Sequence, residues 1–241
     1  MAQLKSMTRI SLSRLTVLGI TLLLPAAQSL RAKEDNPAAK RLNEATATLG
    51  DIMKADDKSI PQDLLDKAQC MVIVPGLKKA GFILGGKFGR GFVTCRGKDG
   101  TGWSAPGAIR IEGGSVGFQI GATEVDVIAI VLNRHGMDKL LSDKFTIGAD
   151  ATAAAGPVGR TSTAQTDAAM RAEILTWSRS RGLFAGIALD GATMRPDVDA
   201  NFELYGKKVD NRAVVTGEVT APPAAAPLLE LLNKYSSRKT K

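Results

Sequence analysis

The chain has 241 residues, of which 44% are hydrophobic and 23% are charged, and its formal net charge is +8. These proportions are typical of a globular protein with a substantial core, and they argue against an intrinsically disordered chain. One histidine and two cysteines exclude the usual closed zinc site and a disulfide-framework mini-protein.

Residues 1–29 have the pattern of a secretory signal peptide. Three cations precede the apolar run 15–24: Lys5, Arg9 and Arg14. This run has about half of the roughly 20 residues that span a bilayer, and small residues follow it. We predict cleavage after Ser29 or Ala32; cleavage after Ser29 removes three cations and lowers the net charge from +8 to +5. We therefore expect an exported protein, either periplasmic or secreted.

Two helices are predicted at the start of the mature chain. Between residues 37 and 54, apolar residues recur at three- and four-residue spacing, with charged residues on the other side of the helix. The apolar positions are Leu42, Ala45, Leu49 and Ile52. A second helix is predicted to begin at Pro61, because proline is favoured in the first turn.

From Met71 onward the pattern changes to that of β-strands. Strand-like segments are separated by glycine-rich turns: 72–74, 81–84, 92–94, 103–111, 115–120, 125–132, 173–180 and 183–189. A short helix is predicted after His135, and another from Pro196 towards Tyr205. We predict an α+β domain over residues 36–206, in which a glycine-rich, strongly curved or closed antiparallel β-sheet is flanked by the N-terminal helices.

Cys70 and Cys95 are a candidate disulfide, because export places both in an oxidising compartment. The alternative is a pair of small buried hydrophobic residues on neighbouring strands. Sequence spacing does not fix the geometry that a disulfide requires, so both interpretations stay open.

Residues 207–241 are interpreted as a Pro/Ala-rich linker followed by a basic tail. The tail contains four leucines within residues 228–232 and ends in lysines and arginine. We favour a weakly docked terminus over an amphipathic membrane or partner contact.

Three motifs suggest catalysis or metal binding and are better explained by turns and helix caps. Residues 113–117 match G-x-S-x-G, but strand-like sequence follows and His135 lies too close in the chain for a hydrolase triad. Residues 197–201 resemble the start of a calcium loop, yet Phe202 and Lys208 stand where glycine and glutamate are required. We therefore expect no enzymatic activity, no metal and no cofactor.

Four cations on and beside the glycine-rich segment 85–91 form a candidate anion site: Lys78, Lys79, Lys87 and Arg90. Such a segment can hold an anionic headgroup. The alternative is an ordinary solvated cluster of loop charges. Nucleic acid is not an expected partner, since aromatic residues for base stacking are scarce.

Several motifs in one unbroken order resemble the SYLF lipid-binding domain. They are residues 74–82, 85–91, 102–106, 117–121, 144–150, 155–160 and 178–186. The resemblance implies non-catalytic binding of anionic phospholipid, which in eukaryotic members means phosphoinositides, often with actin-linked partners and attached Src-homology-3 domains.

From this resemblance and the export signal we expect peripheral binding to an anionic membrane. Phosphatidylglycerol or cardiolipin would be the available lipids if the source is bacterial, and actin is not an expected partner. The four cations would meet phosphates, and the Leu42/Leu49 face of the first helix would add apolar contact. The alternative is a structural or protein-interaction module of the cell envelope.

Overall fold

The computed structural model describes residues 36–55, 59–97, 99–156, 171–180, 183–186, 189 and 191–238; at 81–84, 115–121 and 183–186 it describes the backbone alone. The predicted signal peptide, residues 1–29, and both of its predicted cleavage sites lie outside the described residues.

The centre of the fold is an antiparallel two-stranded ribbon of β1 (Cys70–Cys95) and β2 (Gly107–Val131). The sequence predicted several shorter strands here. The glycine-rich segments between them continue the hydrogen-bonded ladder instead of ending it. Two register shifts, between Val74 and Leu77 and between Gly81 and Ile83, interrupt the pairing, and irregularities of this kind bend and twist a ribbon.

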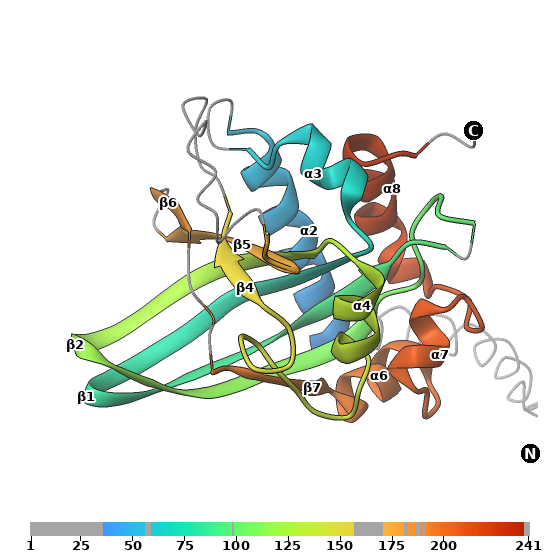
Figure 1. Ribbon diagram of the computed structural model, residues 1–241. Coiled ribbons are helices and arrows are strands. Elements are labelled where there is room, and N and C mark those ends of the chain that lie inside the picture. Colours follow the sequence, from blue (N-terminus) through green and yellow to red (C-terminus); the bar gives the residue numbers. More distant parts are fainter. Residues whose placement is uncertain are drawn as a thin grey trace, which may run out of the picture. The chain divides into compact units, whose positions relative to one another are not determined.

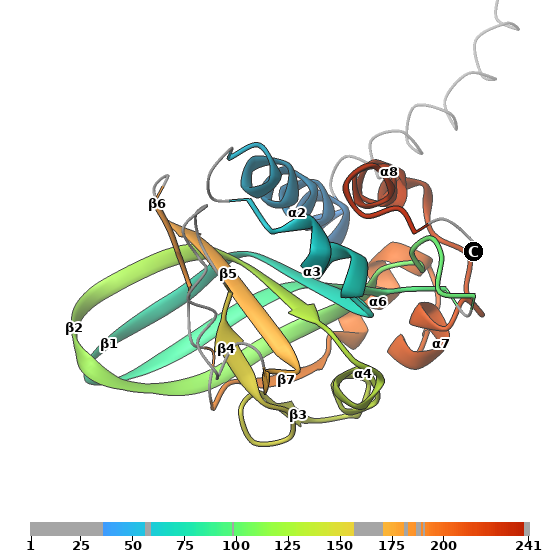
Figure 2. The same ribbon diagram turned by 45° about the horizontal axis from the view of Figure 1, so that its top comes forward.

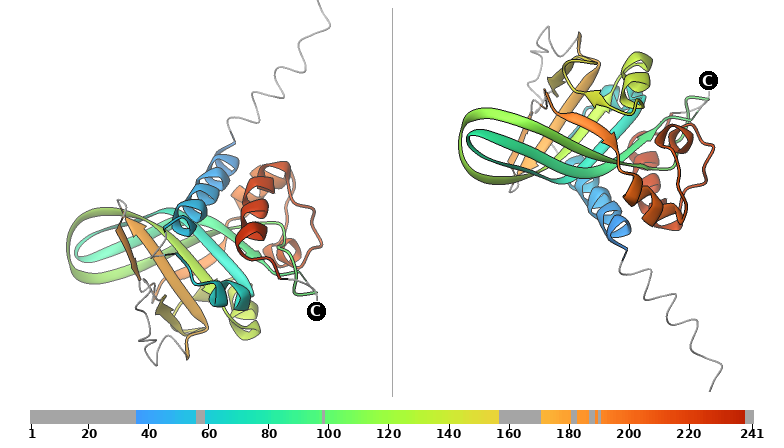
Figure 3. Two further views of the ribbon diagram at one scale, coloured as in Figure 1. Left: turned by 90° about the horizontal axis from the view of Figure 1, so that it is seen from above. Right: turned by 90° about the horizontal axis from the view of Figure 1, so that it is seen from below.

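The ribbon curls so that the two ends of β1 meet (Figures 1 and 3). The sulfur atoms of Cys70 and Cys95 lie 2.07 Å apart, at bonding distance. Beside them, the Arg96 amide donates to the Gln69 carbonyl at 2.8 Å. Within the curl, Gly91 lies against the backbone of Ile73 from the first part of β1. This close approach needs glycine, because a Cβ at position 91 would clash with the Ile73 backbone.

In the part of the chain that the structure describes, five shorter strands extend the ribbon into a seven-stranded sheet. They are β3 (Phe145–Thr146), β4 (Ala153–Ala155), β5 (Ile174–Ser180), β6 (Leu183–Gly186) and β7 (Thr193–Pro196). One half of β2 pairs with β7 and the other half with β5. All pairs are antiparallel except β4 with β5. The predicted α+β class with a strongly curved sheet and N-terminal helices is confirmed.

Helices cover one side of the ribbon (Figure 2). Here α2 (Pro37–Met53), α3 (Gln62–Lys67) and α8 (Ala226–Tyr235) enclose a hydrophobic core against the sheet. A second core fills the inside of the curl around the two cysteines. The other helices of the described residues are α4 (Arg134–Leu140), α6 (Val198–Tyr205), α7 (Asn211–Val215) and the 3₁₀ turn η1 (Pro223–Ala225).

The C-terminal segment differs from the linker and weakly docked tail that the sequence suggested. Residues 36–241 form one compact unit, and Leu228 and Leu232 of α8 are 0% and 1% exposed in the core beside α2. Their spacing of four residues places both on one helix face, and the proline at the start of α8 is compatible with a first helical turn.

Arg96 holds the end of the chain in place. Its buried guanidinium donates to the Ser236 carbonyl at 2.6 Å and to the Leu65 carbonyl at 3.2 Å, and it lies 4.1 Å from the centre of the Trp103 ring. Burial, together with the nearby charge of Arg238, lowers the pKa of Arg96 to about 10, so the group stays charged at neutral pH. Arg96 therefore joins α3, β1 and the chain end.

Candidate functional site

A pocket of about 540 Å³ opens between α2 and the β1–β2 ribbon. Its volume lies within the usual range of about 300–1,000 Å³ for small-molecule sites. The lining comes from four elements: Arg41, Glu44, Ala47 and Thr48 of α2; Pro75, Gly76, Lys78, Phe88, Gly89 and Arg90 of β1; Glu124 and Asp126 of β2; and Arg179 of β5.

Two arginines of the pocket are already paired with carboxylates. Arg179 donates to Asp51 at 2.5 Å and to Asp126 at 2.9 Å. Burial acts to lower the pKa of Arg179, but the hydrogen bonds and charges of these carboxylates outweigh it and raise the pKa. Arg90 lies 3.3 Å from Asp197, whose side chain is 2% exposed. Both arginines are therefore structural charges as well as lining residues.

Four other charged side chains of the lining have no ion-pair partner within 4.0 Å among the described residues. They are Arg41 and Glu44 on α2, and Lys78 and Glu124 on the ribbon. Lys78 and Glu124 stand directly opposite each other in the strand register. Each wall of the pocket thus supplies one cation and one carboxylate that are available to a ligand.

The four predicted cations do not form one rim. Lys78 and Arg90 line the pocket, whereas Lys79 and Lys87 do not. Successive strand residues point to opposite faces, which places the second pair on the other side of the ribbon. Burial, and then the charge of Lys87, lower the pKa of Lys79.

The predicted apolar contact of Leu42 and Leu49 with a membrane is wrong for this conformation. The two side chains are 0% and 1% exposed and belong to the core between α2, the sheet and α8. The helical periodicity correctly identified an apolar face, but that face packs inside the protein. Phe88 is the large apolar side chain exposed at the pocket, at 47%.

Several residues of the pocket were not predicted as site residues: Arg41, Glu44, Glu124, Asp126 and Arg179. The first two were interpreted as the solvent-facing side of the first helix. Arg179 lies in the motif 178–186 that resembles the SYLF domain, and this was the signal that pointed towards it. The remaining residues come together only once it is known which residues of the glycine-rich ribbon point to the same face. The sequence alone did not give this.

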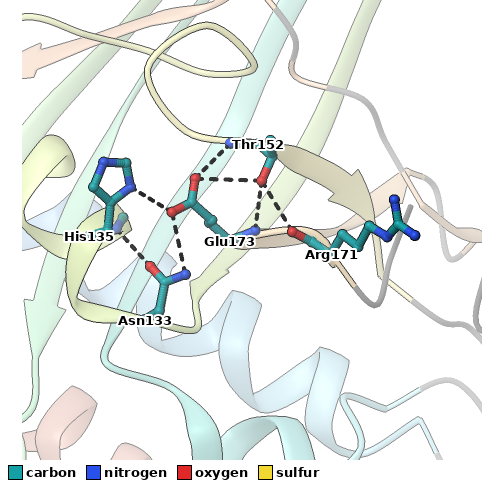
Figure 4. A network of polar contacts seen from close by, with 6 residues as sticks. Asn133, His135, Thr152, Arg171 and Glu173 are labelled. Atoms are coloured by element: carbon teal, nitrogen blue, oxygen red, sulfur yellow. Dashed lines mark hydrogen bonds and ion pairs between the residues drawn. The ribbon is translucent and has the colours of Figure 1, made fainter. Parts of the chain in front are cut away.

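His135 belongs to a polar network outside this pocket (Figure 4). Its Nδ1 lies 2.6 Å from Oε1 of Glu173, which also accepts from the Asn133 side chain at 3.3 Å. The other oxygen of Glu173 accepts from the Thr152 amide at 3.1 Å. The network ties α4 to β4 and β5. Thr152 Oγ1 contacts Glu173 and not His135, so the group lacks the nucleophile–base contact of a catalytic triad.

The carboxylate of Asp197 has a structural role. It caps α6 by accepting from the Ala200 amide at 3.3 Å, and it pairs with Arg90. Within the described part of the chain, no group of three or more His, Cys, Asp or Glu side chains is arranged to hold a metal ion. The side chain of Ser115, from the G-x-S-x-G match, lies outside the described residues.

Residues 112–235 match the Ysc84 family, described as "Las17-binding protein actin regulator". The chain belongs to this family. The SYLF resemblance found in the motifs is thereby confirmed.

Named relatives of the Ysc84 family align over most of this chain. Protein YSC84 of Saccharomyces cerevisiae is 31% identical over 220 residues, covering 86% of this chain and 46% of the yeast protein. SH3 domain-containing YSC84-like protein 1 of Xenopus laevis is 36% identical over 220 residues, covering 89% and 63%. LAS seventeen-binding protein 3 of S. cerevisiae is 34% identical over 212 residues, covering 86% and 45%. The chain therefore spans about half the length of the yeast relatives. The family description gives no support to the expectation that actin is not a partner.

Proposed function

We propose that this Ysc84-family protein is an exported, non-catalytic protein that binds anionic phospholipid at a membrane surface. The observation that carries the proposal is the lining of the pocket. It contains two cations without ion-pair partners among the described residues, Arg41 and Lys78, together with the exposed ring of Phe88.

This combination suits a lipid interface. Each cation near an anionic surface contributes about 1 kcal/mol. Burial of a phenyl ring in the acyl region adds about 1.5–3 kcal/mol at most, and less for a ring that is already half buried. Among the described residues, no helix has the length and hydropathy needed to cross a membrane. We propose a peripheral attachment.

Vesicle sedimentation tests this function. We expect the protein to pellet with phosphatidylglycerol vesicles but not with phosphatidylcholine vesicles, and to be released at high salt, because salt screens surface charges. The double variant Arg41→Gln/Lys78→Gln should bind weakly. Its matched control is Arg134→Gln/Lys139→Gln, which removes the same charges from the exposed surface of α4. Equal pelleting with both lipids, or equal loss in both variants, would reject the proposed site.

A second candidate function is docking to a protein partner of the cell envelope or cytoskeleton. The relatives named for Las17 binding and the family description of an actin regulator favour it. Val198 and Phe202 of α6 are 51% and 53% exposed and lie four residues apart, on the same helix surface. Co-sedimentation with actin filaments tests this function, with Val198→Ser/Phe202→Ser as the surface variant. Binding that is unaffected by that variant excludes the α6 surface.

A further inference from the structure

We propose that the pocket between α2 and the ribbon takes a headgroup that carries both a phosphate and a primary ammonium group, the chemistry of phosphatidylethanolamine. This inference rests on the proposed function, because it assigns a headgroup to the same site. The anionic surface supplies long-range attraction, and the pocket supplies recognition.

The charges of the pocket do not suit a polyanion. Four cations line it, and two of them are paired with buried or half-buried carboxylates. When the carboxylates of the lining and the partners Asp51 and Asp197 are counted, five negative groups stand against four positive ones. A headgroup with several phosphates would therefore meet no net attraction inside the pocket, whereas a zwitterion finds partners of both signs.

The available charges are arranged as two mixed pairs on facing walls. On α2, Arg41 and Glu44 are three residues apart and so lie near each other on the helix surface. On the ribbon, Lys78 and Glu124 are directly opposed. A phosphate between Arg41 and Lys78 leaves Glu44 and Glu124 for a cation two methylene groups away.

Glu124 is held beside the backbone of β1. A Cβ on Gly76 would lie 2.5 Å from Oε1 of Glu124, so the carboxylate rests where glycine leaves room. The neighbouring Gly76 amide donates to Asp126 at 3.0 Å, which directs Asp126 to the backbone and Arg179. Glu124 consequently keeps its acceptor oxygens for a ligand.

Carboxylate acceptors select a primary ammonium over a quaternary one. An ammonium group with three N–H donors can hydrogen-bond to Glu44 and Glu124, whereas choline has no donor. Choline sites rely on cages of several aromatic rings, and Phe88 is the one aromatic side chain in the lining of this pocket as described. Ethanolamine is therefore the preferred headgroup over choline.

The experiment compares vesicles of equal charge. One set contains equal shares of phosphatidylglycerol and phosphatidylethanolamine, and in the other phosphatidylcholine replaces phosphatidylethanolamine. We expect the wild-type chain to bind the ethanolamine vesicles roughly 3- to 10-fold more tightly, from two carboxylate contacts of ordinary strength. Glu44→Gln/Glu124→Gln should bind both sets equally, while Glu218→Gln/Glu230→Gln, which removes the same two charges from exposed positions, should keep the preference.

The outcomes separate the two proposals. Binding to phosphatidylglycerol vesicles without any preference for ethanolamine over choline overturns the headgroup assignment and leaves membrane binding standing. A preference that persists in Glu44→Gln/Glu124→Gln also overturns it. Failure to bind any anionic vesicle overturns the proposed function, and the assignment with it. If the pocket binds the headgroup, soluble glycerophosphoethanolamine added to the ethanolamine vesicles should lower wild-type binding to the level of the choline vesicles. Unchanged binding overturns the assignment.

Discussion

The guanidinium of Arg179 donates to the carboxylate of Asp51 at 2.5 Å, although 128 residues of chain separate them. The same guanidinium reaches Asp126 at 2.9 Å. One arginine of β5 therefore links α2 to β2 at the pocket, in addition to the apolar packing of α2 on the sheet.

Replacement of Arg179 by glutamine should destabilise the fold by about 1–2 kcal/mol, since the pair is partly solvated and two carboxylates lose their donor. Urea denaturation measures this. A double-mutant cycle with Asp51→Asn should show a coupling of about 0.5–1 kcal/mol. Arg134→Gln, an exposed arginine of α4, serves as control and should change stability little. Additive effects of the two substitutions would contradict the contact.

Replacement of Leu232 by alanine should cost about 2–5 kcal/mol, because the side chain is 1% exposed in the main core. Leu229→Ala makes the same chemical change at a partly buried position of the same helix and should cost clearly less. Denaturant midpoints of both variants check the docking of α8. If both substitutions cost nothing, the C-terminal segment is a loose tail.

Much of this fold followed from local patterns. Helical spacing predicted α2, and the change to strand-like residues at Met71 predicted the start of the sheet to within one residue of Cys70, where β1 begins. The continuity of β1 could not be predicted, because glycine-rich segments are typical of turns and here continue a strand. The close approach of Gly91 to the Ile73 backbone joins positions that are 18 residues apart in the chain, and a local sequence pattern does not predict such a contact.

The pocket was predicted less well than the fold for a related reason. Periodicity separates buried from exposed positions, but it does not distinguish bulk solvent from a pocket. Arg41 and Glu44 therefore had the same signal as any solvated helix charge. Strand alternation predicts that Lys78 and Lys79 point to opposite faces. It does not predict that Lys78 and Arg90 share a face, because register shifts lie on both sides of the lysine pair and change which residues point the same way. The family motif contains Arg179, but it does not predict that Arg179 pairs with Asp51 and Asp126.

The protein as purified under oxidising conditions should contain no titratable thiol when it is denatured without a reductant, because Cys70 and Cys95 form a disulfide. Their sequence separation is 25 residues, and loop-closure entropy then gives a stabilisation of about 3.5 kcal/mol. Cys70→Ser/Cys95→Ser should lower the free energy of unfolding by this amount. Thiol titration and urea denaturation measure the two effects. Two free thiols in the unreduced wild type would reject the bond.

Glu173 should make stability dependent on acid. Partial burial acts to raise its pKa, but hydrogen bonds from His135, the Thr152 amide and Asn133 outweigh burial, so the pKa is lowered in the folded state. A carboxylate with a lowered folded pKa stabilises the fold above its unfolded pKa of about 4.3, and this stabilisation is lost as the pH falls through the folded pKa. The difference in unfolding free energy between wild type and Glu173→Gln should therefore be largest at neutral pH and should shrink in acid.

Urea denaturation across the pH range measures this difference, with Glu230→Gln as a control on an exposed carboxylate. A difference that stays constant down to pH about 3 would show that Glu173 titrates alike in the folded and unfolded chains. The network of Figure 4 would then stabilise the fold through packing and not through the charge of Glu173.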